Sequence, residues 1–200
     1  MYFRVFFVPT PMAVDTTYER FIDICVDNAT DDPVKLFRML IRDEDVPMHS
    51  RMHHVIVPMV LVTAYWYAVK DFDLRSYLRE TVERASEVPE MICGYWGCCG
   101  SAIGTGLFLS VITRTNPISR GKRYAQCNKL TSDSLARISE VGGPRCCKRN
   151  AVLSIQTACA SLERDFGVKL RPSAYGCTRS GDNKECIGNR CPFYIQKNNQ

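Results

Sequence analysis

The sequence predicts an all-α protein, with a single domain of about seven helices over residues 1–170 and an irregular, cysteine-bearing tail at residues 171–200 packed on it. Three observations favour this fold class. Helix start signals and glycine or proline stops recur along the chain, with apolar residues between them at the 3.6-residue spacing of a helix. No segment has the alternation of apolar and polar residues that is typical of a half-buried strand. A length of 200 residues suits one domain with a sizeable core.

The N-terminal region carries two helix starts. Residues 2–8 are expected to form a short edge strand or an arm. The stretch Asp15-Thr16-Thr17 can cap a helix that runs to about residue 28, and Cys25 lies on its apolar stripe, which predicts a core cysteine. The pair Asp32-Pro33 places an N-cap residue before a proline at the first helical position, which predicts a second helix.

The run Val55 to Val69 is apolar on nearly all sides, which predicts a central, buried helix. It is shorter than the roughly 20 residues that a membrane span needs. Pro58 inside the run removes one hydrogen bond and frees the carbonyl of His54. A kink is therefore expected next to the histidines.

All three histidines of the chain precede or begin this run. If the helix already includes His49, then His49 and His53 lie one turn apart on one face, a spacing that suits a metal. If Ser50 is the N-cap, His49 lies outside the helix, and this argument weakens. The alternative is that His49, His53 and His54 are ordinary surface or capping residues.

Four further helices are expected. The first covers about Asp73 to Val88, and the second, Ser101 to Ile112, follows and includes glycines that would let another backbone come close. The third begins near Ser119 and ends before Gly142, with an interruption expected near residues 131–133. The fourth starts at Pro144 and continues to Gly167, and Cys159 in its middle is expected in the core.

Cysteine is the unusual residue of this composition. Ten of the eleven cysteines follow residue 92, and the N-terminus lacks the apolar stretch of a signal peptide, so a cytoplasmic protein is expected. A reducing compartment and an odd number of cysteines disfavour a disulfide scaffold. Residues 1–113 carry a net charge of −5 and residues 114–200 a net charge of +10, so most cysteines share the basic half. Metal binding or thiol catalysis is therefore the favoured class of function.

Two cysteine groups lie near predicted helix starts. Cys93, Cys98 and Cys99 precede one apolar run, and the string Gly-Gly-Pro-Arg-Cys-Cys-Lys-Arg at residues 142–149 precedes another. Exposed N–H groups and the helix dipole at such positions favour thiolate over thiol. Thiolate is both the nucleophile and the metal-binding form of cysteine.

The tail contains a third cysteine group. Cys186 and Cys191 are separated by four residues with a Gly-Asn turn, and Pro192 follows. Such a spacing suits a zinc knuckle, and a cysteine followed by proline also occurs in iron–sulfur ferredoxins. The pair is half a site, which Cys177 or a cysteine from the helical domain would have to complete. Metal ligation would give order to a segment that has little apolar content.

Together these motifs resemble a cysteine-rich family of unknown function in strictly anaerobic archaea and bacteria, over roughly residues 45–195. The string Gly-Gly-Pro-Arg-Cys-Cys carries the resemblance most specifically. The resemblance implies an anaerobic setting in which exposed iron–sulfur clusters survive. It also implies a partner protein of the redox, methyltransferase or radical-enzyme class, because members are sometimes joined to such domains. Cys98 is extra relative to the family pattern, so Cys99 is preferred as a ligand.

Three functions remain open. The first is an iron–sulfur protein of anaerobic metabolism with a cubane (4Fe-4S) cluster. Its candidate metal ligands are Cys99, Cys146, Cys147, Cys186, Cys191, His49, His53 and His54, and Cys93, Cys99, Arg145 and Lys148 are expected to contact the cofactor. The second is a thiol-based redox or sulfur-transfer enzyme with Cys146, Cys147 and His53 as its catalytic candidates. The third is a zinc protein that binds a partner through its basic half. Nucleic acid is the least favoured partner, no membrane is expected, and the oligomeric state is left open.

Overall fold

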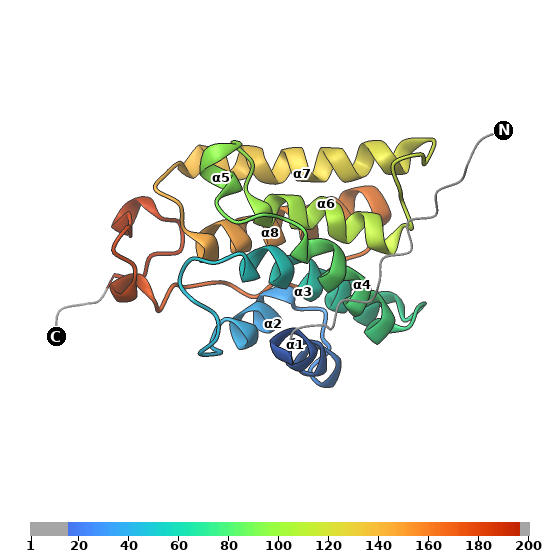
Figure 1. The fold of residues 1–200 in the computed structure, drawn as a ribbon, viewed down its shortest axis with the longest axis horizontal. Coiled ribbons are helices and arrows are strands. Elements are labelled where there is room, and N and C mark those ends of the chain that lie inside the picture. Colours follow the sequence, from blue (N-terminus) through green and yellow to red (C-terminus); the bar gives the residue numbers. More distant parts are fainter. Residues whose placement is uncertain (1–15, 197–200) are drawn as a thin grey trace.

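In the computed structural model, which describes residues 16–196, the chain forms a bundle of eight α-helices, and no β-strand is present in that range (Figure 1). The helices are α1 (Thr16–Asp27), α2 (Pro33–Leu40), α3 (Met52–Val69), α4 (Leu74–Ser86), α5 (Ile92–Tyr95), α6 (Gly100–Ile112), α7 (Lys122–Val141) and α8 (Cys147–Phe166), followed by the short 3₁₀ turns η1 (Ser180–Asp182) and η2 (Gly188–Arg190). The predicted all-α fold is confirmed. The strand or arm expected at residues 2–8 lies outside the described residues.

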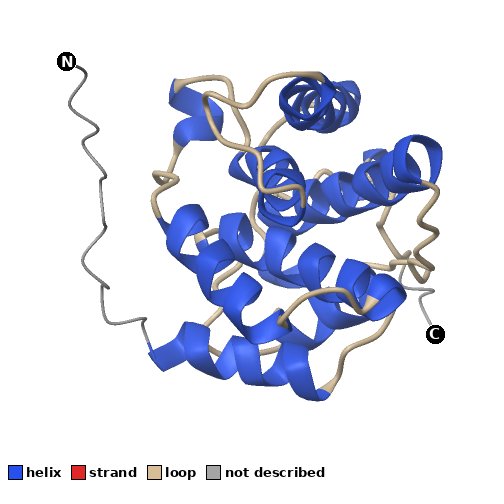
Figure 2. Cartoon of the chain, turned by 90° about the vertical axis from the view of Figure 1, so that its right-hand side faces the viewer, coloured by secondary structure: helices blue, strands red, loops and turns tan. Residues whose placement is uncertain are grey.

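Helix α3 is the centre of the bundle. It packs against α1, α2, α4, α6 and α8, and every residue from His53 to Ala64 is buried. Figure 2 shows the helices of the bundle packed side by side, with loops between them. By length and apolar composition α3 is the one described helix that could cross a membrane, but 67% of it is buried inside the fold. Its apolar character is therefore accounted for by burial among the other helices.

Glycines of α6 set how closely its neighbours approach. A Cβ atom added at Gly104 would meet Pro58 Cδ of α3 at 2.8 Å and the His54 carbonyl oxygen at 3.1 Å. On the other side of α6, a side chain at Gly106 would clash with the Thr131 hydroxyl of α7. The glycines therefore provide the close helix packing that the sequence predicts.

Three details differ from the sequence prediction. The sequence predicts seven helices, and the additional helix is α5, which lies in the first cysteine stretch and has only four residues. Helix α7 runs without the expected interruption, because Thr131 donates a hydrogen bond to the Cys127 carbonyl and Ser134 lies 3.0 Å from the Thr105 hydroxyl of α6. Helix α8 begins at Cys147 rather than Pro144, and Cys146 is its N-cap.

The C-terminal segment, residues 171–196, lies against the helical bundle. The backbone N–H of Arg171 donates to the Asp31 carbonyl, and Phe193 is 7% exposed within the core cluster. The ring of Tyr175 contacts Phe37 of α2 and Phe193. In Figure 1 this red segment lies beside the start of α8. The predicted core cysteines, Cys25 and Cys159, are both buried.

Candidate metal centre

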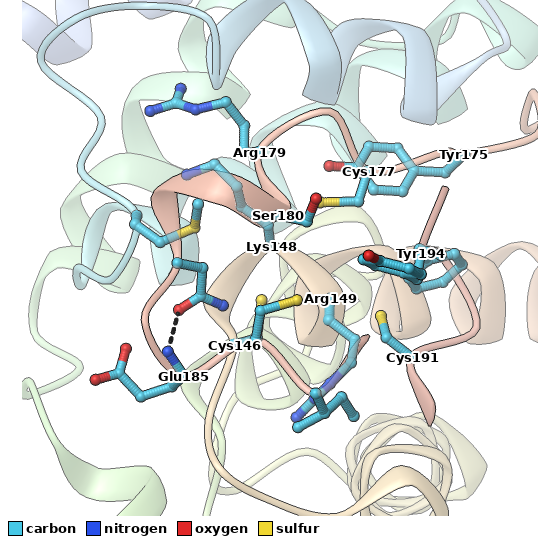
Figure 3. Close-up of a pocket in the computed structure, with 15 residues that line it drawn as sticks. Cys146, Lys148, Arg149, Tyr175, Cys177, Arg179, Ser180, Glu185, Cys191 and Tyr194 are labelled. Atoms are coloured by element: carbon cyan, nitrogen blue, oxygen red, sulfur yellow. Dashed lines mark hydrogen bonds between the residues drawn. The ribbon is translucent and has the colours of Figure 1, made fainter. Parts of the chain in front are cut away.

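Four cysteines from distant parts of the sequence line one pocket beside the N-terminal end of α8. These are Cys146, Cys177, Cys186 and Cys191, and we call this place the four-thiol pocket. Figure 3 shows the first of them on the chain leading into α8, with Cys177 and Cys191 on the C-terminal segment that closes over it. Four thiols around one space are the donor set of a tetrathiolate metal site.

The loop before α8 positions Cys146. As the N-cap it has an extended backbone, with φ −139° and ψ 108°. The guanidinium of Arg149, one turn into the helix, donates hydrogen bonds to the carbonyls of Gly142 (2.7 Å) and Pro144 (2.9 Å). Arg149 is only 3% exposed. The glycine-proline loop is thus fastened to the helix that follows it, which fixes where Cys146 lies.

Backbone hydrogen bonds position the other three thiols. The N–H of Cys177 donates to the Phe193 carbonyl at 2.7 Å, within a parallel bridge between Cys177 and Tyr194. The N–H of Cys186 donates to the Asn183 carbonyl at 3.0 Å, and that of Cys191 to the Gly188 carbonyl at 2.8 Å. The loop therefore has little regular structure but a defined path.

The thiols of this pocket interact electrostatically. Burial raises the pKa of Cys177, and the neighbouring Cys146, Cys191 and Cys186 raise it further. Burial also raises the pKa of Cys191, whereas Arg149 lowers it. Because each thiolate would repel the others, the metal-free pocket favours thiols. A cation or a cationic cluster core would reverse that preference.

Lys148 is a buried cation between the cysteine groups. It is 1% exposed, and its ammonium donates to the Pro47 carbonyl at 3.1 Å. Burial and Arg179 lower its pKa, while Cys146, Cys147 and Cys177 raise it. A positive charge here is compensated when the surrounding thiols become thiolates.

His53 is among the ligand and acid–base candidates of the sequence analysis. It lines neither the four-thiol pocket nor the second cysteine pocket, which is described next. Its Nδ1 lies 3.2 Å from the Ser50 carbonyl oxygen, and its Nε2 lies 3.5 Å from the Lys148 ammonium. Burial, followed by the Lys148 charge, lowers the pKa of His53 to about 3. We therefore assign His53 a structural role as a neutral ring that supports Lys148.

A second pocket gathers the remaining candidate residues, and we call it the thiol–imidazole pocket. Its potential ligands are Cys93 of α5, Cys99 at the N-cap of α6, Cys147 at the start of α8, and the rings of His49 and His54. Asn150 donates to the Cys99 sulfur at 3.5 Å. Arg145 also lines this pocket. The sequence analysis groups the candidate cysteines as ligands of one site. In the structure they line two separate pockets.

His49 lies outside α3, which begins at Met52. Of the two alternatives that the sequence leaves open, the structure has the one in which His49 lies outside the helix, so the argument for a His49–His53 pair on one helix face does not apply. Burial raises the pKa of Cys147 to about 11, and the backbone at Ser50 and the charge of Arg145 lower it only in part. The helix N-terminus does not make Cys147 a thiolate, which disfavours Cys147 as the nucleophile of a thiol enzyme.

Among residues 16–196, no three or more His, Cys, Asp or Glu side chains are arranged so that they could hold a metal ion. The pockets supply suitable donor types in suitable numbers, but their side chains would have to turn inward around a ligand. In the four-thiol pocket three of the donors lie on a loop with only 3₁₀ turns, which can adjust at low cost.

The model of a family of unknown function (DUF5714) matches residues 21–194. The chain belongs to this family. The match spans seven of the eight helices completely, most of α1, and both cysteine pockets. No curated protein and no solved structure matches this chain. Membership of DUF5714 agrees with the predicted resemblance to an uncharacterised family.

Cys177 lines the four-thiol pocket, whereas the sequence indicates it only as one way to complete the knuckle. Its spacing from Cys186 fits no common motif, so no local signal selects it. The Cys177–Tyr194 bridge, which brings it over Cys146, is a tertiary feature. Cys98 does not line either pocket, whereas Cys99 lines the thiol–imidazole pocket.

Proposed function

We propose that this protein is an iron–sulfur protein whose cubane (4Fe-4S) cluster is held by Cys146, Cys177, Cys186 and Cys191. The observation that carries the proposal is that these four thiols line one pocket, together with one carboxylate, that of Glu185, and no histidine. A cubane cluster takes four thiolates, so the number and type of donors fit. When bound, such a cluster supplies one-electron transfer.

The surroundings of the pocket support a negatively charged, redox-active group. Lys148, Arg149 and Arg179 line it and would offset the charge of thiolates and cluster. Tyr175, Phe193 and Tyr194 supply aromatic walls that limit access of water, which is one way proteins tune the potential of a cluster. Cys191-Pro192 has the cysteine–proline sequence of ferredoxins.

The setting we propose is the cytoplasm of an anaerobic organism, with a redox, methyltransferase or radical enzyme as the partner. This part rests on the resemblance and on the composition. Zinc in the four-thiol pocket is the competing proposal, since four thiolates are also a zinc ligand set.

Metal and acid-labile sulfide analysis after anaerobic purification tests the proposal. We expect about four irons and four sulfides per chain, with a broad absorption band near ~400 nm. The variant Cys177→Ser should lose most of both, whereas Cys98→Ser, a cysteine outside either pocket, should keep them. Zinc without iron in the wild-type protein would favour the zinc proposal. Equal iron in both variants would contradict the assigned ligand set.

A further inference from the structure

The thiol–imidazole pocket contains an unusual concentration of unsatisfied polar atoms. Among the described residues, three buried side-chain nitrogen or oxygen atoms have no hydrogen-bond partner, namely His49 Nδ1, His54 Nδ1 and Ser154 Oγ. The two imidazole nitrogens both belong to rings that line this pocket. A buried polar atom without a partner costs free energy, and an ion that binds there is one standard explanation.

The hydrogen bonds of His49 determine which of its nitrogens is free. Its Nε2 lies 3.1 Å from Asn183 Oδ1, an oxygen that also accepts the Glu185 N–H at 3.1 Å. The Glu185 carboxylate lies 3.5 Å from the same Nε2. Because both neighbours accept, Nε2 must donate, and Nδ1 keeps a lone pair. Metal-binding histidines commonly have this arrangement, with one nitrogen donating to a protein acceptor.

His54 is held more rigidly than His49. It is 8% exposed, and its ring occupies the space that a side chain at Gly100 would need. The ring therefore lies between α3 and the start of α6, and its Nδ1 has no hydrogen-bond partner.

Three thiols complete the donor set. Cys93, Cys99 and Cys147 line the same pocket as His54, and they come from three different helices or helix starts. Cys93 lies on the short helix α5, so it can move inward without disturbing a long element. Three thiolates and one imidazole are a common tetrahedral ligand set for zinc.

We infer that the thiol–imidazole pocket is a second metal site, in which Cys93, Cys99, Cys147 and His54 bind one ion of the zinc class. It shares no ligand with the four-thiol pocket, so it does not depend on the proposed cluster. His49 is a fifth donor at the edge of the site. The adjacent residues Cys146 and Cys147 would then serve two different metal centres.

The position of this site suggests contact with small molecules. Cys93, Cys99, Arg145 and Asn150 also line a groove that continues along α7. An ion bound by these cysteines would lie at the end of that groove. If one of the four ligands dissociated, the ion would have an open coordination position that faces the groove. Catalytic zinc sites have such an open position, whereas structural zinc sites are closed.

Titration with Co²⁺, a spectroscopic substitute for Zn²⁺, tests the inference. The protein used is the Cys177→Ser/Cys191→Ser variant under anaerobic, reducing conditions, because the four-thiol pocket is then incomplete. We expect about one Co²⁺ per chain with thiolate charge-transfer bands and the visible bands of tetrahedral cobalt. Adding Cys99→Ser should weaken binding more than about 100-fold, and adding Cys98→Ser should leave it unchanged.

Histidine variants test the imidazole ligand. His54→Ala should shift the visible bands and weaken binding, whereas His49→Ala should change the affinity by no more than about tenfold. Loss of the cobalt bands in His49→Ala alone would overturn the choice of His54. A folded double variant that binds no Co²⁺ would overturn the whole site. If the double variant fails to fold, the same comparison of Cys99→Ser with Cys98→Ser is made in the otherwise wild-type chain, where zinc content must differ by about one ion per chain.

Discussion

Cys146 and Cys147 are neighbours in the chain, yet they line different pockets. Cys146 is the N-cap of α8 with an extended backbone, and Cys147 is the first helical residue. The change of backbone conformation between them turns the two side chains apart, one toward Cys177 and the C-terminal segment, the other toward Cys99. A helix start near these residues could be predicted from sequence, but its position at Cys147 and the direction of each thiol could not.

The two thiols should therefore be separable by mutation. We expect Cys146→Ser to lower iron and sulfide content strongly and to leave Co²⁺ binding in the thiol–imidazole pocket intact. Cys147→Ser should do the opposite. Iron analysis and cobalt titration of both variants measure this directly. If each variant lost both its iron and sulfide content and its Co²⁺ binding while the helical circular dichroism was retained, the two cysteines would belong to one site.

His53 gives a pH dependence to stability. Its folded-state pKa is about 3, well below the ordinary value of 6.5. Between these values the unfolded chain binds a proton that the folded chain does not. This ring therefore leaves the free energy of unfolding unchanged above about pH 6.5 and lowers it as the pH falls toward 3, by about 1.4 kcal/mol per unit.

Urea unfolding of the metal-free protein and of His53→Gln tests this effect. The difference in free energy of unfolding between pH 7 and pH 5 should be about 2 kcal/mol smaller in the variant. An identical pH dependence in both proteins would show that His53 is not buried as a neutral ring.

At the scale of elements, the contact of α3 with α6 depends on Gly104. Because a Cβ there would approach Pro58 Cδ to 2.8 Å, Gly104→Ala should destabilise the fold by about 1–3 kcal/mol despite the better helix propensity of alanine. Gly94→Ala is the matched control, since nothing lies within 4 Å of a Cβ at that position. Chemical denaturation measures both, and equal stability of the two variants would contradict the close contact.

The elements that sequence reasoning found are those with local signals. Asp32 accepts the Lys35 N–H, so this cap forms as the Asp-Pro pattern predicts, and Asp73 at the start of a later predicted helix likewise accepts the Ser76 N–H. Helix α5 was missed because it is a single turn entered through Met91 in a left-handed conformation (φ 64°), which leaves no apolar period to detect. The expected break in α7 was wrong because the Thr131 hydroxyl donates to the Cys127 carbonyl of the same helix and Ser134 lies 3.0 Å from the Thr105 hydroxyl of α6.

At the scale of the whole molecule, the four-thiol pocket lies where the C-terminal segment meets the helical bundle. The sequence predicts that metal ligation orders this segment, but it does not show that the segment covers α8. That arrangement depends on contacts between distant residues, such as Tyr175 with Phe37 and Arg171 with Asp31. Such pairings have no signature in the spacing of residues.

Removal of metal should therefore loosen the C-terminal segment more than the bundle. We expect amide hydrogen exchange in residues 177–194 to become at least about tenfold faster after chelation, because ligation contributes folding free energy there. Exchange in α3, which is buried among helices, should change little. Uniform acceleration along the chain would instead indicate that the whole fold depends on metal.

The most direct test of the central claim is a crystal structure of the anaerobically purified protein with anomalous diffraction measured at the iron absorption edge. The account predicts an iron peak enclosed by the sulfur atoms of Cys146, Cys177, Cys186 and Cys191. An iron peak bound by Cys93, Cys99 or Cys147 instead, or a four-thiol pocket occupied by zinc in protein that contains iron elsewhere, would contradict it.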